Sequence, residues 1–267
     1  MPELPVLQRA RGAGRIAVTA EDGRTRLRRL FQEGCGKIRL PRGPDCEAVL
    51  INSSGGLTGG DRIDWTAEAG ARSDLTLTTQ ACEKVYRARD GEAHAAATLT
   101  AGAGARIDWL PQETILFDGG ALARRLDVEL ASGARLLAAE AVVLGRTAMN
   151  ETVRSGSIRD RWRVRREGRL VFADDIRLAG PIADLAGRGA ILAGARAFAS
   201  LLLVADDADR LLKPLRAAIG ALGGASAFDG KLFARLVAPD GFTLRKALLP
   251  ALEVLRDGRP LPRVWRT

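Results

Sequence analysis

The chain has 267 residues, of which 46% are hydrophobic and 27% charged, and its formal net charge is +9 at pH 7. This length can bury a core large enough to fold without disulfides or a structural metal. No run of about 18 apolar residues occurs, and the N-terminus lacks the basic and apolar regions of a secretory signal, so we expect a cytoplasmic protein without membrane spans.

The segment from 52 to 62, NSSGGLTGGDR, contains four glycines followed by a single acid, Asp61. Glycine at this density permits positive φ angles and close backbone contacts, so the segment has a specified shape. A P-loop requires GxxxxGK[ST], whereas Asp61 and Arg62 follow Gly60 here, which argues against a nucleotide site. The simpler interpretation is a tight turn between strands, closed by Asp61 accepting backbone N–H groups.

A Gly-Ala-Arg unit occurs at 70–72, 104–106 and 133–135, each time between stretches of alternating apolar residues. This pattern predicts strand, turn and strand. Spacings of 34 and 29 residues are too irregular for a strict solenoid but indicate stacked hairpins or a β-helix-like array. We therefore predict a mainly β fold, with a stacked-strand body from about residue 15 to 180.

The stretch 159–166, RDRWRVRR, is a basic segment with an interleaved aromatic side chain. With a pI near 10.4, it leaves an Arg-rich nucleic-acid-binding protein as an alternative function. However, the alternation of Trp162 and Val164 with charges also predicts a half-buried edge strand. The excess of arginine over lysine across the chain is typical of a GC-rich genome, which weakens the argument from charge.

Beyond Gly180-Pro181 the pattern changes to a small α/β part, at about 195–260. The expected elements are a Gly/Ala-rich linker (185–194), a strand (198–204), a helix capped by Asp206 and ended by Gly220, a strand (231–237) and a helix (242–255). No charged or Ser/Pro-rich linker separates this part from the body, so we predict a single structural unit over 1–267.

Few side chains in the sequence are suited to catalysis. His94 is the one histidine, it stands in an expected turn that leads into a strand, and neither GxSxG nor HExxH occurs. Cys35, Cys46 and Cys82 are odd in number and share no CxxC spacing, which argues against disulfides and gives little support to zinc. Carboxylate pairs are possible among 32 acids, but no spacing selects one. We predict that the chain is not an enzyme.

Two segments are more polar than their strand context requires. TTQACEKVYR (78–87) ends an expected strand in amide and charged groups, and WLPQETILFDGG (109–120) places Pro111, Gln112 and Glu113 inside an apolar pattern. Proline at such a position breaks the ladder or marks an edge, which leaves polar groups free to contact another element or another chain. These features indicate recognition.

Five segments in the same order, with KIRLP (37–41) upstream, resemble the urease accessory protein family UreD, also called UreH. They are NSSGGLTGGDR (52–62), TTQACEKVYR (78–87), WLPQETILFDGG (109–120), LGRTAMNE (144–151) and LPRVWRT (261–267). The residues of this chain that match motif positions of the UreD family are Gly55, Gly56, Gly59, Gly60, Gln80, Lys84, Tyr86, Arg87, Pro111, Gln112, Glu113, Gly145 and Arg146.

The resemblance implies a non-catalytic protein with a β-helix-like body and a small helical part. It implies direct binding to UreF, contact with the GTPase UreG through UreF, and nickel delivery to apo-urease within a two-fold assembly. No nucleic acid or membrane partner is implied. We expect no tightly bound cofactor or tight metal site, and only transient Ni²⁺.

The resemblance also implies a water-filled passage for nickel through the protein. Its candidate residues are Asp61, Thr78, Glu140 and Asp174. Successive oxygen ligands attract a divalent cation without trapping it, which suits conduction. The alternative for Asp61 and Glu140 is that they only satisfy backbone donors. Cys82 differs from the small residue expected there, and we do not make it a ligand.

Overall fold

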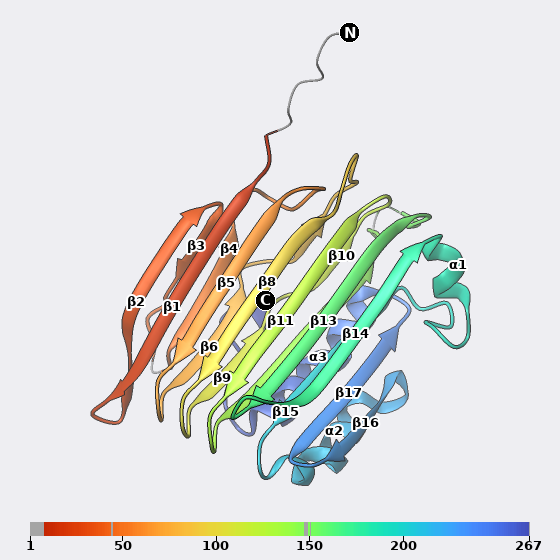
Figure 1. Ribbon diagram of the computed structural model, residues 1–267. Coiled ribbons are helices and arrows are strands. Elements are labelled where there is room, and N and C mark those ends of the chain that lie inside the picture. Colours follow the sequence, from red (N-terminus) through yellow and green to blue (C-terminus); the bar gives the residue numbers. More distant parts are fainter. Residues whose placement is uncertain (1–7, 44, 147–148, 150, 267) are drawn as a thin grey trace.

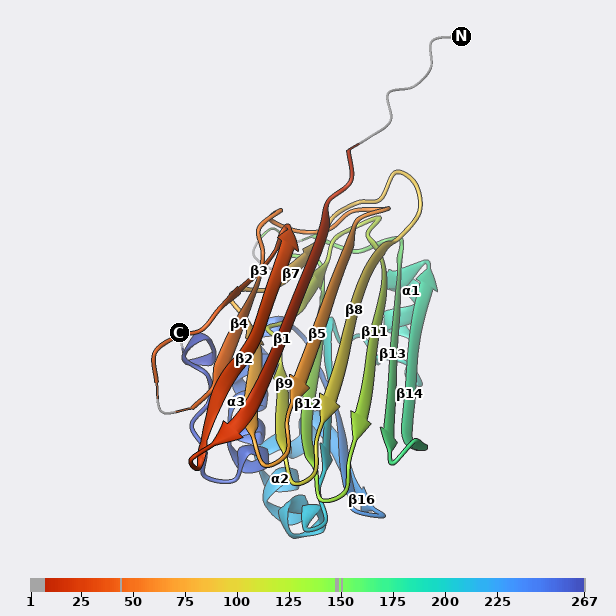
Figure 2. The same ribbon diagram turned by 60° about the vertical axis from the view of Figure 1, so that its left-hand side comes forward.

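The computed structural model describes residues 8–43, 45–146, 149 and 151–266. In this part of the chain, the strands form a seven-stranded and a ten-stranded sheet that lie face to face (Figure 1). We call them the first and the second sheet. Figure 2 shows helices on the outer side of the second sheet, while the outer side of the first sheet carries none.

The first sheet has the spatial order β14 (Arg169–Gly180), β13 (Gly156–Arg166), β11 (Ala121–Leu130), β8 (Ala93–Ala101), β5 (Arg62–Ala69), β1 (Arg11–Glu21) and β2 (Arg24–Gly34). The second has the order β16 (Gly223–Phe228), β17 (Lys231–Ala238), β15 (Ala197–Val204), β12 (Arg135–Leu144), β9 (Arg106–Leu110), β6 (Asp74–Thr79), β4 (Glu47–Asn52) and β3 (Gly36–Arg39). Beside this path, β10 (Thr114–Leu116) pairs with β12 and with β7 (Glu83–Val85).

The chain alternates between the sheets as it advances. β5, β8, β11 and β13 pair in parallel in the first sheet, and β4, β6, β9 and β12 pair in parallel in the second. Each first-sheet strand and the second-sheet strand that follows it form one coil of a β-helix-like solenoid. The fold class predicted from the sequence is confirmed, and of the two arrangements considered it is the β-helix-like one.

The three Gly-Ala-Arg units are the turns between the sheets, as their pattern predicts. Gly104 and Gly133 have φ angles of +63° and +67°, whereas in the first copy the positive φ of +56° falls on Arg72. The turns also stack on each other, because Arg72 N donates to Ala103 O at 2.9 Å and Gly104 N donates to Ser132 O at 3.0 Å. Repetition of one turn therefore keeps successive coils in register.

The space between the sheets is filled by alternate residues of each strand. In the first sheet, the register aligns Trp65, Ala97, Leu126 and Trp162 in one inward row. A second core lies on the other side of the second sheet, where α2 (Leu212–Ile219) and α3 (Gly241–Arg256) cover it. β15 is buried on both faces, which explains its sequence AFASLLLV, apolar except for Ser200.

The C-terminal part follows the predicted order with several corrections. Asp206 does not cap a helix: its carboxylate pairs with Arg166, and α2 begins at Leu212 after the 3-10 turn η2 (Ala208–Leu211). The linker expected at 185–194 includes the end of the helix α1 (Ile182–Gly187). β16 was not predicted, because its sequence GGASAF lacks the alternation of a strand. The expected end of the first helix at Gly220 is confirmed, and so is the strand 231–237 within β17.

The prediction that 159–166 forms an edge strand is half wrong. Trp162 and Val164 point inward and are 1% and 0% exposed, as the alternation predicts. However, β13 lies inside the sheet, between β11 and β14, and β14 is the edge. The hairpin turn at Glu167-Gly168 returns the chain as β14 and covers the edge that β13 would otherwise present.

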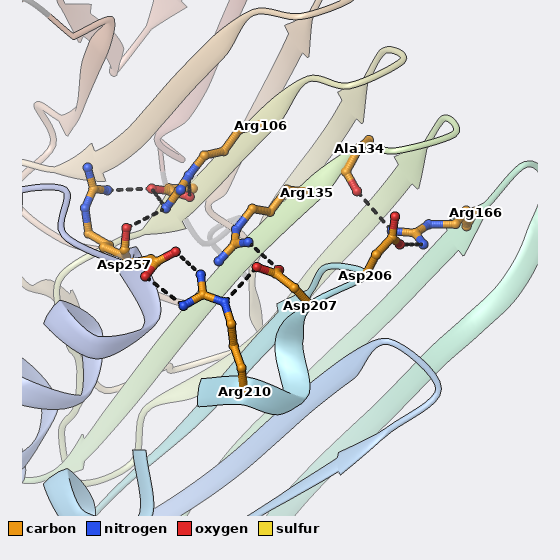
Figure 3. A network of polar contacts seen from close by, with 10 residues as sticks. Arg106, Ala134, Arg135, Arg166, Asp206, Asp207, Arg210 and Asp257 are labelled. Carbon is orange, nitrogen blue, oxygen red and sulfur yellow. Dashed lines mark hydrogen bonds and ion pairs between the residues drawn. The ribbon is translucent and has the colours of Figure 1, made fainter. Parts of the chain in front are cut away.

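Polar contacts at the turn end of the solenoid attach the C-terminal part (Figure 3). Arg135 contacts Asp207 at 2.9 Å, and Arg210 bonds both to Asp207 and to Asp257. Deeper in, Asp108 accepts from Arg106 at 3.0 Å and from Arg256 of α3 at 2.6 Å. Since β15 also pairs with β12, the C-terminal strands continue the second sheet of the solenoid.

The Arg256–Asp108 contact yields a prediction for stability. Asp108 is 1% exposed, so Arg256→Met should leave a buried carboxylate short of one cation and lower the unfolding free energy by about 3 kcal/mol. Arg259→Met is the control, because the Arg259–Asp74 pair is half exposed and should cost below about 1 kcal/mol. Urea unfolding measures both, and we expect a single transition. Equal losses of unfolding free energy in the two variants would contradict a stabilising role of the buried Arg256–Asp108 pair.

Candidate functional site

The motif segments that carry the family resemblance meet at one end of the solenoid. The segment 52–62 contacts 78–87 through the Leu57–Val85 bridge, and 78–87 contacts 109–120 through the β7–β10 pairing. Gly145 N then donates to Leu116 O at 2.8 Å, which adds the start of 144–151. We call this region, made of segments 52–62, 78–87, 109–120 and 144–146, the motif end. Thr147, Ala148 and Asn150 lie outside the described residues.

The glycine loop at the motif end is shaped by close contacts. A Cβ on Gly56 would lie 2.4 Å from the Tyr86 ring, and one on Gly59 would lie 2.0 Å from the Asp90 carbonyl oxygen. Gly55 and Gly60 need their positive φ angles of +80° and +85°. The loop is therefore specified by sterics at two positions and by backbone conformation at two others.

Asp61 closes this loop from inside. It is 5% exposed, its Oδ1 accepts from Ala10 N at 2.8 Å, and its Oδ2 accepts from Thr58 N at 2.8 Å. This is the arrangement of the simpler interpretation, in which the acid satisfies backbone donors. A role for Asp61 in nickel passage stays a prediction.

Glu140 lies between the two sheets in a network of buried polar side chains. Its carboxylate accepts from the indole N–H groups of Trp109 and Trp162, each at 2.9 Å, and contacts Arg124 Nε at 2.9 Å. Arg124 also donates to Asp160 at 2.6 Å. Burial raises the pKa of Glu140, while the Arg124 charge opposes that shift and Asp160 adds to it.

Two members of the network, Arg124 and Asp160, are incompletely bonded. Arg124 Nε has an ion-pair contact but no hydrogen bond to a described residue. Asp160 is 3% exposed, and its Oδ1 has no hydrogen-bond partner among the described residues. Arg124, which is 9% exposed, supplies a single positive charge for two carboxylates. With both acids ionised, the network would therefore carry one net negative charge inside the protein.

A cavity of about 60 Å³ lies beside Glu140. Alanines of β8, at 95, 96 and 97, line it together with Trp65 and Trp109, so the small residues of one strand leave space between bulky neighbours. Thr79, Glu83, Pro111 and Gln112 of the motif end also line the cavity. It thus connects the family motifs with the interior acid.

Glu83 is the acid that lines this cavity from the motif end. Its two oxygens accept from Asn52 Nδ2 at 3.1 and 3.2 Å. Burial raises the pKa of Glu83 to about 7, against the opposing effect of the Asn52 hydrogen bond. Glu83 therefore titrates near neutral pH.

Of the four predicted passage residues only Glu140 lines the cavity, so the structure does not bring Asp61, Thr78 and Asp174 together with it there. Thr78 is fully buried, and its hydroxyl has no hydrogen-bond partner in the described part of the chain. Asp174 pairs with Arg235 at 2.5 Å, and burial raises its pKa.

Five residues of the cavity and the polar network were not predicted from the sequence: Glu83, Arg124, Asp160, Trp109 and Trp162. A signal for Arg124 and Asp160 was present, because period-2 alternation places both on the inward face of their strands, the same face as Leu122 and Ile158. A charged side chain on the inward face of a strand needs a partner of opposite charge or a hydrogen bond. Such a residue in the sequence therefore indicates a buried polar network.

The strand break after β9 anchors the C-terminal segment. Pro111, Gln112 and Glu113 separate β9 from β10 and are buried. Arg245 of α3 donates to Gln112 at 2.7 Å and to Glu113 at 3.0 Å, and its guanidinium lies 5.0 Å from the Trp265 ring. Trp265 in turn donates to Leu110 O at 3.0 Å. The motif at 261–266 is thus attached to the motif end.

A hollow of about 690 Å³ lies on the surface of the motif end. Arg87 pairs with Asp118 at 3.0 Å, and Arg146 pairs with Glu151 at 2.8 Å and stacks 4.6 Å from the Phe117 ring. Tyr86 is 41% exposed there. Gln80 and Lys84 expose their side chains as well, so these motif residues are available to another molecule.

Cys82 and His94 are the remaining side chains that were considered for metal binding or catalysis. Cys82 contacts Glu113 at 3.5 Å, and burial raises the pKa of its thiol to about 11, which keeps it protonated. His94 is exposed on β8. Among the described residues, no group of three or more His, Cys, Asp and Glu side chains is arranged to hold a metal ion. No described helix is long and apolar enough to cross a bilayer.

The basic segment of β13 gives no support to the nucleic-acid hypothesis. Arg159 pairs with Glu92 at 2.8 Å, Arg163 with Asp175, and Arg166 with Asp206. Three of its charges are therefore neutralised by neighbouring carboxylates, which weakens any interaction with phosphates.

The glycine loop predicts a steric effect on stability. Gly59→Ala should cost at least about 2 kcal/mol of unfolding free energy, because the new Cβ would overlap the Asp90 carbonyl oxygen. Gly224→Ala is the control, since nothing lies within 4 Å of its Cβ position, and its effect should be within about 0.5 kcal/mol. Urea unfolding compares them, and similar values would refute the close packing of this loop.

Glu83 predicts a pH dependence. A carboxyl whose pKa is about 4.3 in the unfolded chain and about 7 when folded binds more protons in the folded state, so its stabilising effect is lost as pH rises between these values. Glu83→Gln should therefore gain stability relative to the parent chain from pH 5 to pH 8. Urea unfolding at each pH measures the difference, with Glu33→Gln at an exposed position as reference. A difference that does not change with pH would contradict the shift.

Known proteins resemble this chain over nearly its whole length. The sequence is 55% identical over 261 residues to a urease accessory protein UreD of Rhizobium leguminosarum bv. viciae and 56% identical over 261 residues to one of Rhizobium etli; each alignment covers 97% of this chain and 96% of the relative. A UreD of Agrobacterium fabrum is 54% identical over 260 residues, covering 97% of this chain and 92% of the relative. The sequence model of the UreD urease accessory protein family matches residues 10–266. The resemblance drawn from the motifs is confirmed, and the chain belongs to the UreD family of urease accessory proteins.

Proposed function

We propose that this chain is a non-catalytic scaffold that acts with UreF and the GTPase UreG to deliver nickel to apo-urease. The observation that carries the proposal is the family match over residues 10–266, which includes nearly all of the five motif segments. The exposed side chains of the motif residues Gln80 and Lys84 support a docking role, since they are accessible to partners. In this role the chain would work in the cytoplasm, within a two-fold assembly.

The proposal includes transit of nickel between the two sheets. Glu83 at the motif end and Glu140 in the interior line the same cavity, so a cation entering at the motif end would meet two carboxylates in succession. Oxygen ligands bind Ni²⁺ more weakly than imidazole or thiolate do, and weak binding permits release. Glu140 and Glu83 thus form the proposed path, with Asp61, Thr78 and Asp174 as further candidates.

Arg124 weakens the attraction of this path for a cation. Its positive charge offsets one of the two negative charges of Glu140 and Asp160, so the network attracts a cation less strongly than two free carboxylates would. Asp160 Oδ1 is buried and has no hydrogen bond within the described structure. This weaker attraction favours transit of a nickel ion over its retention in the protein.

Replacement of Glu140 tests the passage. Glu140→Gln keeps the shape of the side chain and one acceptor for the tryptophans but removes the charge. In cells that need this chain for urease activation, we expect urease activity and the nickel content of urease to fall by at least about tenfold. Glu68→Gln, an exposed position on β5, is the matched control and should activate urease normally.

Co-purification distinguishes the parts of the proposal. UreF and urease subunits should co-purify with the parent chain and equally with Glu140→Gln. Normal activation by Glu140→Gln would remove this carboxylate from nickel transit, while leaving the scaffold role intact. A parent chain that binds neither UreF nor urease would refute the scaffold role itself.

A further inference from the structure

Strand β2 is unusually exposed for part of a sheet. Of its eleven residues, RTRLRRLFQEG, ten are exposed and only Thr25 is partly covered. β1 pairs with one edge of β2, and no strand of the described chain pairs with the other. Figures 1 and 2 show β2 as the outermost strand of the first sheet, opposite β14. An unpaired edge of this length is a template for another strand.

The inward face of β2 is apolar and incompletely covered. The register pairs Leu27 with Val18 and Leu30 with Ile16, and both β1 residues are 2% exposed. Leu27 and Leu30 themselves are 45% and 38% exposed. The facing strand β3 has only four residues, so the second sheet ends before it covers this part of the first.

The two ends of β2 are nevertheless held in place. Thr25 Oγ1 accepts from Asp74 N at 2.9 Å, and Gln32 Oε1 accepts from Ile38 N at 2.8 Å. The exposed leucines lie between these two attachments. The apolar face is therefore fixed in position before any partner binds, which lowers the entropic cost of binding.

The outward face of β2 is strongly basic. Arg24, Arg26 and Arg29 face outward, opposite Glu21, Thr19 and Ala17 of β1. Of these, Arg26 has a carboxylate, Glu21, at 3.6 Å, and Arg24 and Arg29 have no ion pair with a described residue. Arg28 is the extra residue of a β-bulge. Bulges and arginines hinder unselective strand addition, so a strand that binds here needs compensating charge.

We propose that β2 binds an extended acidic segment of a partner protein, which adds to the first sheet as a further strand. Alternate residues of the segment would be acidic, opposite Arg26 and Arg29, and the residues between them would be apolar, over Leu27 and Leu30. Directly opposed side chains on one face of a sheet lie about 5 Å apart, close enough for ion pairs. This mode is strand addition at an open edge.

A second copy of the chain fits this edge less well. Four arginines and one glutamate give β2 a charge of +3, so two β2 strands would repel each other. The partner is therefore distinguished by its negative charge. This inference concerns an edge that contributes nothing to the motif end, and it holds whether or not nickel passes between the sheets.

A synthetic peptide of about nine residues, in which glutamate alternates with valine, serves as the probe. We expect it to bind the full chain and to slow amide hydrogen exchange in residues 24–34. A peptide of the same charge with two internal prolines should not bind, because proline prevents strand pairing. The double variant Arg26→Glu/Arg29→Glu should weaken binding at least about tenfold.

Arg161→Glu/Arg177→Glu is the matched control, since it changes the net charge equally at two exposed arginines of β13 and β14. It should leave the affinity within about twofold. Circular dichroism confirms that both double variants are folded. Equal weakening in the two variants, equal binding of the proline peptide, or unchanged exchange in 24–34 would overturn the proposal. So would a concentration-dependent dimer of the parent chain that Arg26→Glu/Arg29→Glu abolishes.

Discussion

The structure depends on one geometric constraint: each coil must leave the first sheet and enter the second within a few residues, level with the coil before it. The Gly-Ala-Arg turns meet this constraint by stacking through backbone hydrogen bonds between neighbouring coils. Because the coils stay level, inward side chains form rows across the first sheet. One row is Trp65, Ala97, Leu126 and Trp162, and the next is Ile63, Ala95, Arg124 and Asp160. The register thus places a charged pair beside a row that contains alanine between bulky residues.

This placement explains both the network and the cavity. Alanines on β8 cannot fill the space between Trp65 of the neighbouring strand β5 and Trp109 of β9 in the facing sheet, which leaves the cavity of about 60 Å³. Placing two carboxylates and one guanidinium in such a core costs several kcal/mol per ion unless hydrogen bonds compensate. The two indole N–H groups compensate Glu140, whereas Asp160 keeps one unpaired oxygen. An apolar core of the same volume would be at least as stable, so stability does not account for these charges.

Much of the fold could be predicted from local pattern, and most of the network could not. Turn residues and alternation predict the strands of the solenoid, because each strand has one inward face. They did not predict β16, which pairs with β17 although its Gly-rich sequence has no alternation of apolar and polar residues. Glu140 was found only by resemblance. Its contacts to Arg124 and Trp162 depend on which strands of opposite sheets face each other, which no single-strand pattern contains.

The C-terminal part completes the environment of Glu140. Along β12, even-numbered residues such as Ala138 and Val142 pack between the sheets, and odd-numbered ones such as Ala139 and Ala141 pack against the core under α2 and α3. Glu140 has the inward parity, and the strand that carries it is flanked by β9 and β15 and covered by helices on its other face. The cavity beside this carboxylate is lined by Thr79, Glu83 and Gln112 of the motif end. The helical appendage thus covers the outer side of the second sheet, and residues of the motif end line part of the cavity that lies on its inner side.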